Sequence, residues 1–169
     1  MEGPVARAEP ATDATPVRAS RAVSVGLAIS GPRMLTHDLA LPLPSVRVGV
    51  NLSPRLALDL TVGALPYDAT GRRTMIDLGA RWFFSDHHTS PYAMVRAGDF
   101  FSNAQEGAAH GRSYPLVTVG AGIEYACGCG FVAWAEAGPA LFRYTDGVSS
   151  SAAGGLYLSL GAGYRIAVP

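Results

Sequence analysis

The sequence contains no lysine and has few charged residues of any kind. Arginine supplies all 13 basic side chains, and these balance 13 acidic ones, so the formal net charge is zero. Charged residues make up 15% of the 169-residue chain, whereas soluble domains average about 25%. A neutral chain lacks the basic surface that binds phosphate backbones, so we expect no nucleic-acid partner.

Long apolar runs are also missing. The longest uncharged stretch covers residues 147–164, and it is rich in serine and glycine with period-2 alternation. A membrane-spanning helix needs about 20 mainly apolar residues. If the chain lies in a membrane, it must lie there as a closed β-barrel, because only helices and closed barrels satisfy their backbone hydrogen bonds in lipid.

Cysteine is scarce, with Cys127 and Cys129 separated by a single glycine. Two cysteines this close do not make a disulfide framework. We expect two turn cysteines that an oxidising compartment can join, and the alternative is a redox-labile disulfide. A CxC pair lacks the four ligands of a structural zinc site. The sequence therefore predicts no metal site and no cofactor.

The pattern that is present is strict alternation of apolar and small or polar residues. In the last such segment, Leu156, Leu158 and Leu160 alternate with Tyr157 and Ser159. This is typical of a strand with two different faces. Eight segments with this pattern follow one another. Eight is an even number, as bacterial single-chain barrels require. Their predicted bounds are 21–30, 45–52, 55–65, 72–84, 91–101, 113–126, 131–143 and 154–166.

We therefore predict an all-β fold, an eight-stranded antiparallel up-and-down transmembrane β-barrel over residues 21–169. Residues 1–20 are rich in proline, alanine and threonine without periodicity, which indicates a flexible leader. Ala6-Arg7-Ala8 has the form of a signal-peptidase site. Two interpretations of it stay open, the tail of a signal peptide and a chance match in an alanine-rich segment.

The polar face of the predicted strands carries charges of both signs. An eight-stranded barrel has an interior just wide enough for side chains to fill, and buried charges must pair. We expect an ion-paired interior that blocks free flow, and the alternative is a gated ion or proton path. The predicted inward charges are Arg47, Arg55, Asp59, Asp77, Arg81, Arg96, Glu124, Glu136 and Arg165.

All aromatic residues lie at or after Tyr67 and near the ends of predicted strands. This arrangement indicates two girdles of interfacial aromatics. The chief predicted girdle residues are Trp82, Phe84, Phe101, Tyr125, Phe131, Tyr157 and Tyr164. The outer group also holds Tyr67, Phe100, Tyr114, Phe142 and Tyr144, and the periplasmic group also holds Phe83, Tyr92 and Trp134.

The run from Leu158 to Ile166, LSLGAGYRI, resembles the closing strand of the OmpA transmembrane domain and related small outer-membrane barrels. The family run is also L-S-L-G, two residues, then Tyr-Arg and an apolar or aromatic residue. This resemblance implies a Gram-negative outer-membrane location, a bilayer with lipopolysaccharide as the surroundings, and a C-terminal signal read by the barrel-assembly machinery. Ile166 stands where the family usually has an aromatic residue, and three residues follow it.

We expect a monomeric barrel with a structural, anchoring or surface-interaction role and no enzymatic activity. Its longer connections, residues 31–44 and 102–112, would form the contact surface. Three alternatives remain: a weak small-solute pore, an outer-leaflet lipid-modifying enzyme, and a soluble lipocalin-like barrel with the aliphatic face inside. An enzyme would have to use Asp99, His110 and Ser113, which match no local catalytic motif.

Overall fold

A computed structural model of the chain describes residues 21–34, 43–68, 71–103, 112–145 and 150–168. These residues form a succession of long strands without an intervening helix. The strands are β1 (Ala22–Met34), β2 (Leu43–Asn51), β3 (Leu56–Asp68), β4 (Gly71–Phe83), β5 (Thr89–Asn103), β6 (Arg112–Ala126), β7 (Phe131–Thr145) and β8 (Ser150–Ala167).

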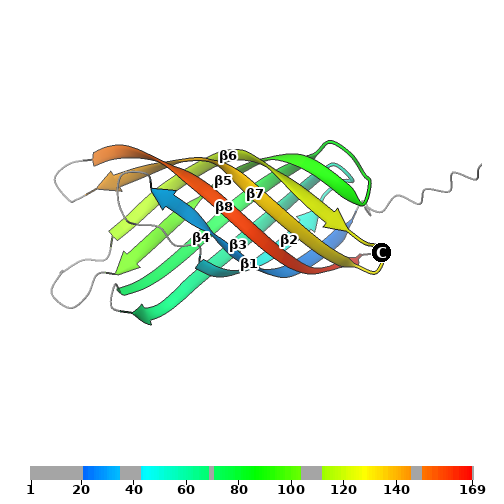
Figure 1. The fold of residues 1–169 in the computed structure, drawn as a ribbon, viewed down its shortest axis with the longest axis horizontal. Helices are drawn as coiled ribbons and strands as arrows, with labels where there is room; N and C mark the ends of the chain where they lie inside the picture. The colour runs from blue at the N-terminus through cyan, green and yellow to red at the C-terminus, as the bar shows by residue number, and fades with distance from the viewer. Residues whose placement is uncertain (1–20, 35–42, 69–70, 104–111, 146–149, 169) are drawn as a thin grey trace, which may run out of the picture.

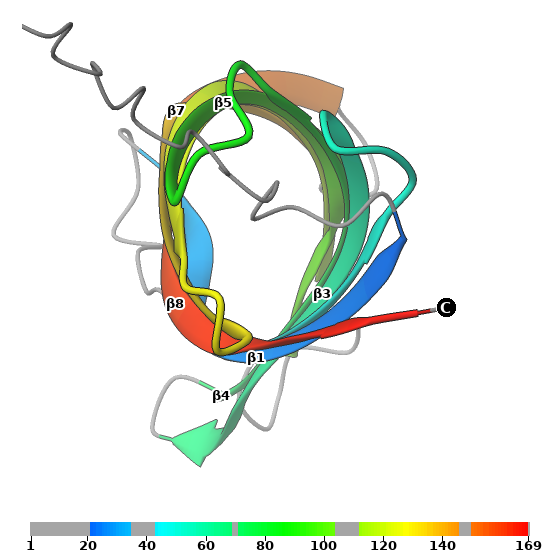
Figure 2. The same ribbon diagram turned by 90° about the vertical axis from the view of Figure 1, so that its right-hand side faces the viewer.

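Each strand pairs antiparallel with its neighbours in the sequence, and β8 returns to pair with β1, which closes the barrel (Figures 1 and 2). At the closing seam Ile29 lies opposite Leu160, and Val25 lies opposite Tyr164. The view along the barrel in Figure 2 shows the strands as one ring. The predicted fold class, an eight-stranded up-and-down barrel, is confirmed.

The alternation in sequence becomes alternation in burial. In β2 every second residue is exposed, and the residues between them are buried. Val46 and Val48 therefore lie on the outside, while Arg47 between them is 2% exposed. Apolar side chains outside and charges inside contradict the lipocalin-like alternative, which requires the aliphatic face to line the interior.

The interior carries an apolar layer near the end of the barrel opposite the termini. Met75, Phe100 and Tyr114 occupy adjacent register positions on β4, β5 and β6. The rings of Phe100 and Tyr114 lie 6.1 Å apart between centroids. Leu116 and Phe142 join the same buried cluster. These side chains close that end of the interior with packed apolar atoms.

Luminal glycines make room for the large inward side chains of neighbouring strands. A Cβ atom on Gly26 would lie 2.5 Å from Cη2 of Trp134, and one on Gly122 would lie 2.5 Å from Cζ of Tyr92. Both distances are well inside van der Waals contact, so glycine is required where these rings cross the barrel. Small residues on the inner face thus follow from the packing of large ones opposite.

Several strands extend beyond their predicted ends. β7 ends at Thr145 and β8 begins at Ser150, so the pairing between these two strands extends further than the alternation predicted. β1 also continues to Met34. Part of each predicted contact loop is therefore strand, and the remainder of both loops lies outside the described residues. The predicted leader, residues 1–20, also lies outside them. Within the described ranges, no helix has the length and hydropathy that crossing a membrane demands.

Candidate functional site: a buried charge network

The inward charges of seven strands, β2 to β8, meet in the middle of the barrel. Eight of the nine predicted inward charges are at most 9% exposed. We call these residues the buried charge network: Arg47, Asp59, Asp77, Arg81, Arg96, Glu124, Glu136 and Arg165.

Arg55, the ninth, is wrongly placed by the prediction. It is exposed and lies in the turn before β3, which begins one residue later at Leu56. Its backbone N–H donates to the Ser53 hydroxyl at 3.3 Å. Alternation assigned Arg55 to the inner face, but alternation fixes orientation only where the residue is held in the ladder.

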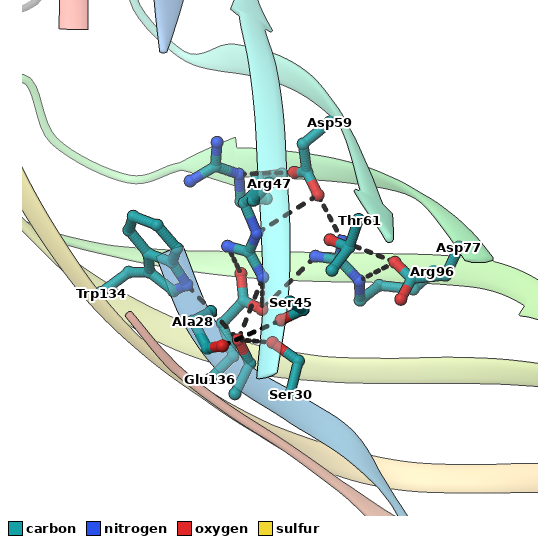
Figure 3. Close-up of polar contacts among 12 residues, drawn as sticks. Ala28, Ser30, Ser45, Arg47, Asp59, Thr61, Asp77, Arg96, Trp134 and Glu136 are labelled. Carbon is teal, nitrogen blue, oxygen red and sulfur yellow. Dashed lines mark hydrogen bonds and ion pairs between the residues drawn. The ribbon is translucent and has the colours of Figure 1, made fainter. Parts of the chain in front are cut away.

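Arg96, on β5, is the most connected member of the network (Figure 3). Its Nε donates to Asp77 at 2.7 Å, and its Nη2 donates to the Thr61 hydroxyl at 2.7 Å. Nη2 also pairs with Asp59, and Nη1 reaches Glu136 at 3.3 Å. One guanidinium thus joins three carboxylates from three different strands, as the five fixed donors of arginine allow.

Arg47, on β2, crosses the barrel to Glu136 on β7. Its two terminal nitrogens donate to the two carboxylate oxygens at 2.8 and 2.5 Å, which is the bidentate arrangement (Figure 3). Nη2 also reaches the Ser159 hydroxyl at 3.2 Å. That hydroxyl accepts a hydrogen bond from Nε1 of Trp134 at 3.3 Å. Backbone segments far apart in the sequence are therefore fixed to each other through side chains.

The network continues toward the end of the barrel that carries the termini. Arg81 pairs through Nε with Asp59 at 2.8 Å and through Nη1 with Glu124 at 2.9 Å. The other oxygen of Glu124 accepts from Nη2 of Arg165 at 2.5 Å. Asp59 and Glu124 are thus each shared by two or more arginines, which offsets the cost of removing the charges from water.

Aromatic rings cover the arginines inside the barrel. The Arg47 guanidinium lies 4.7 Å from the centroid of the Trp134 ring, and that of Arg96 lies 5.6 Å from Tyr157. Arg81 lies 5.6 Å from the Tyr92 ring. Tyr92 also donates from its hydroxyl to Glu136 at 2.8 Å. Cation–π contacts of this kind are strongest when the cation is desolvated.

These contacts correct the aromatic prediction. Tyr157 is 0% exposed and points inward, so it is not an interfacial girdle residue. The same correction applies to Phe83, Tyr92, Phe100, Tyr114, Trp134 and Phe142, which are all buried. Proximity to a strand end suggested a girdle, but odd or even position along the strand decides which face a ring lies on.

The other six chief girdle residues do lie on the outer surface: Trp82, Phe84, Phe101, Tyr125, Phe131 and Tyr164 are 39–60% exposed. The rings of Tyr67 and Tyr144 lie outside the described side chains. The exposed aromatics lie near strand ends, where the sequence predicted an interfacial position.

Little free volume remains beside the charges. An enclosed space of about 10 Å³ lies between Arg47, Arg81, Glu124 and Trp134. This holds at most one water molecule, which needs roughly 10–15 Å³. At this level the interior is packed rather than open.

Sequence reasoning left several interior residues out of the predicted network. Arg73, in β4, is buried at 7% exposure, and Thr61 and Ser159 supply hydroxyls to the network. Alternation had placed Thr61 and Ser159 on the inner faces of their strands, and parity with Asp77 could also have found Arg73. It could not have shown which guanidinium each hydroxyl contacts.

Outside the network, Cys127 and Cys129 form a disulfide in the turn between β6 and β7. Among the described residues, no three histidine, cysteine or acidic side chains come together as a metal site would require. Of the predicted enzyme set, the Ser113 hydroxyl donates to Asp99 at 2.6 Å on the outer surface. His110 lies outside the described residues, and the serine contacts the acid rather than an imidazole base.

The fold has solved counterparts. No family model matches the sequence, and no curated protein matches it. The N-terminal β-barrel domain of Pseudomonas aeruginosa OprF is 18% identical with a TM-score of 0.63, over 88% of this chain and 100% of that domain. Neisserial surface protein A (NspA) is 14% identical with a TM-score of 0.54, over 88% of this chain and 97% of its own.

The attachment invasion locus protein Ail of Yersinia pestis is a further counterpart. It is 18% identical with a TM-score of 0.52, over 88% of this chain and 99% of that one. At these identities the likeness concerns the fold. The chain has the fold of small eight-stranded outer-membrane β-barrels.

Proposed function

We propose that this chain is a bacterial outer-membrane barrel with a structural, anchoring or surface-interaction role. The observation that carries the proposal is the outer surface of the barrel. Large aliphatic side chains of all the strands are exposed there, among them Leu27, Leu60 and Leu160 at 72%, 40% and 66%. Soluble monomers rarely expose continuous apolar patches above a few hundred Å², whereas a lipid-facing barrel needs such a band.

The distribution of exposed charge supports the same role. Arg55 and Asp86 lie in turns at the end near the termini, and Arg33 and Arg143 lie near the opposite end. Among the described residues, the exposed aromatics lie near strand ends, with Phe101 at the end opposite the termini and the others at the end near them. In outer-membrane barrels generally, an apolar band about 25 Å tall, flanked by aromatic rings, matches the hydrocarbon layer and its interfaces.

The closed interior favours a structural role over transport. The paired charges, the apolar layer and the aromatic rings fill the space through which a solute would pass. In this proposal the barrel faces lipid and lipopolysaccharide, β8 supplies the assembly signal, and the end opposite the termini faces outward. The crystal structure of Ail in complex with the heparin analogue sucrose octasulfate is consistent with surface contacts as a role for barrels of this fold.

Fractionation and gel mobility test the proposal. The chain is expressed behind a secretory signal, and the membrane fraction is run on gels with and without boiling. We expect the protein in the outer-membrane fraction, with a faster unboiled band because the closed barrel stays folded in detergent. A protein that remains soluble without detergent would contradict the proposal.

A further inference from the structure

The disulfide turn at the end of the barrel near the termini has features that a purely structural crosslink does not need. Cys127 and Cys129 enclose one residue. A loop this short removes little freedom from the unfolded chain, since disulfide stabilisation grows with loop length. The turn is instead held by backbone bonds, from Cys127 N–H to the Phe131 carbonyl at 3.0 Å and from Gly130 N–H to the Cys127 carbonyl at 3.1 Å.

The two sulfurs differ in their surroundings. Cys129 is exposed and Cys127 is half-buried. The backbone N–H of Cys129 donates to Sγ of Cys127 at 3.2 Å. A Cβ atom on Gly128, between them, would meet nothing within 4 Å. An attacking group therefore has access to Cys129, while Cys127 holds the hydrogen bond that stabilises a departing thiolate.

A cavity of about 340 Å³ lies beside this disulfide and is lined by residues of the turn and of the ends of β1 and β8. The disulfide, Tyr164, Ile166 and Arg165 line it. The Arg165 side chain is 7% exposed and pairs through Nη2 with Glu124. Its Nε and Nη1 are buried and have no hydrogen-bond partner among the described residues. The backbone N–H of Arg165 donates to the Gly130 carbonyl at 2.7 Å, which fixes the turn against β8.

We infer that this turn and its cavity form a thiol–disulfide exchange site for small thiols that carry carboxylates. The positive charge of Arg165, which lines the cavity, would attract the carboxylates, and the thiol would reach Cys129. The inference does not depend on the membrane in which the barrel lies.

The exchange balances with two thiol molecules. The thiolate of the first attacks Sγ of Cys129, a new S–S bond forms, and the Cys127–Cys129 bond breaks with its electron pair on Sγ of Cys127. The thiolate of the second then attacks the sulfur of the first, which releases Cys129 as a thiolate. The two thiols leave as one disulfide after losing two electrons and two protons. The two cysteines take up these electrons and protons and become thiols.

Reduced glutathione is the probe, because it carries a thiol and two carboxylates. The folded protein in detergent micelles, checked by its unboiled gel mobility, is compared with a disulfide-closed peptide of residues 125–131. We expect the folded protein to be reduced about tenfold faster than the peptide, because Arg165 and the disulfide line the same cavity. An equal or slower rate would overturn the inference.

The charge of the thiol isolates the part played by Arg165. Rising sodium chloride should slow the reaction of the wild type with glutathione. It should leave the rate of the reaction with cysteamine, whose amine is positive, unchanged or increase it. Arg165→Gln should remove the preference for glutathione. If that variant does not fold, the salt series on the wild type decides alone, and equal salt dependence for both thiols would contradict the role of Arg165.

The attacked sulfur is identified with single variants and oxidised glutathione. Since these are the chain's two cysteines, each variant has one thiol. We expect Cys127→Ser, which keeps Cys129, to form the mixed disulfide faster than Cys129→Ser, with mass spectrometry as the readout. The reverse order would contradict the assignment of Cys129 as the attacked atom.

Discussion

Arg96 shows how single residues hold the interior together. It is 0% exposed and pairs with Asp59, Asp77 and Glu136. Each of these acids would carry an uncompensated charge away from water if the guanidinium were removed. Breaking a buried pair in this way is strongly destabilising, whereas the intact pair contributes less than its geometry suggests.

Arg96→Met should therefore lower the free energy of unfolding by about 3–5 kcal/mol, measured by urea titration in detergent micelles. Arg55→Met is the matched control. Arg55 is exposed in a turn, so its replacement should change the free energy by less than about 0.5 kcal/mol. Equal effects of the two substitutions would show that the network does not exist as described.

Gly26→Ala should lower the free energy of unfolding by about 1–3 kcal/mol, the usual cost of overpacking. The added Cβ atom would lie 2.5 Å from Trp134 and 2.7 Å from the Ala162 carbonyl oxygen. Gly154→Ala, where nothing lies within 4 Å of the new atom, is the control. In a Trp134→Phe background the cost of Gly26→Ala should shrink, and an unchanged cost would place the clash elsewhere.

At the scale of strands, the sequence predicted more than it did for single residues. Alternation correctly identified the eight strands of the described residues and the apolar outer face of each. It failed at strand ends in both directions. Pairing between β7 and β8 continues to Ser150, beyond the last alternating residues, whereas β3 begins only at Leu56 and leaves Arg55 in the turn. Tyr157 was assigned wrongly for another reason. Alternation placed it on the inner face, where it lies, but its place near a strand end led to a girdle assignment.

Leu60→Arg should destabilise the barrel by about 2–4 kcal/mol, because Leu60 lies mid-strand on the exposed face of β3 and an arginine there must enter the hydrocarbon layer. The measurement is reversible unfolding in lipid vesicles. Asp86→Arg adds the same side chain in an exposed turn and should have almost no effect. Similar effects at both positions would argue against a lipid-facing β3.

At the scale of the whole molecule, barrel closure decides which residues meet. Alternation predicted that charges would gather inside and pair, and the structure shows eight of them doing so. The partners could not be predicted, because Arg47 and Glu136 are 89 residues apart in the sequence and meet only across the closed interior. The disulfide was foreseen as one outcome for the turn, whereas the cavity beside it depends on how β8 returns to β1.

The closed interior predicts that the wild-type barrel, inserted in a planar bilayer, passes no sustained current. The physical reason is that charged, aromatic and apolar side chains occupy its cross-section at several levels. Single-channel recording checks this. The protein is delivered to the bilayer from lipid vesicles, and the gel mobility of protein recovered from the same vesicles confirms that it is folded and inserted. A stable open state in the wild type would contradict a structural role and favour the pore alternative.

The central claim is that the apolar face lies in lipid and the polar face lies inside, and the two tryptophans of the chain test it directly. Trp82 is 51% exposed on the outer face, and Trp134 is 5% exposed on the inner face. Trp134→Phe and Trp82→Phe leave one tryptophan each, for fluorescence in vesicles whose acyl chains carry bromine as a quencher. We predict strong quenching of Trp82 and little quenching of Trp134. Equal quenching, or stronger quenching of Trp134, would contradict the claim.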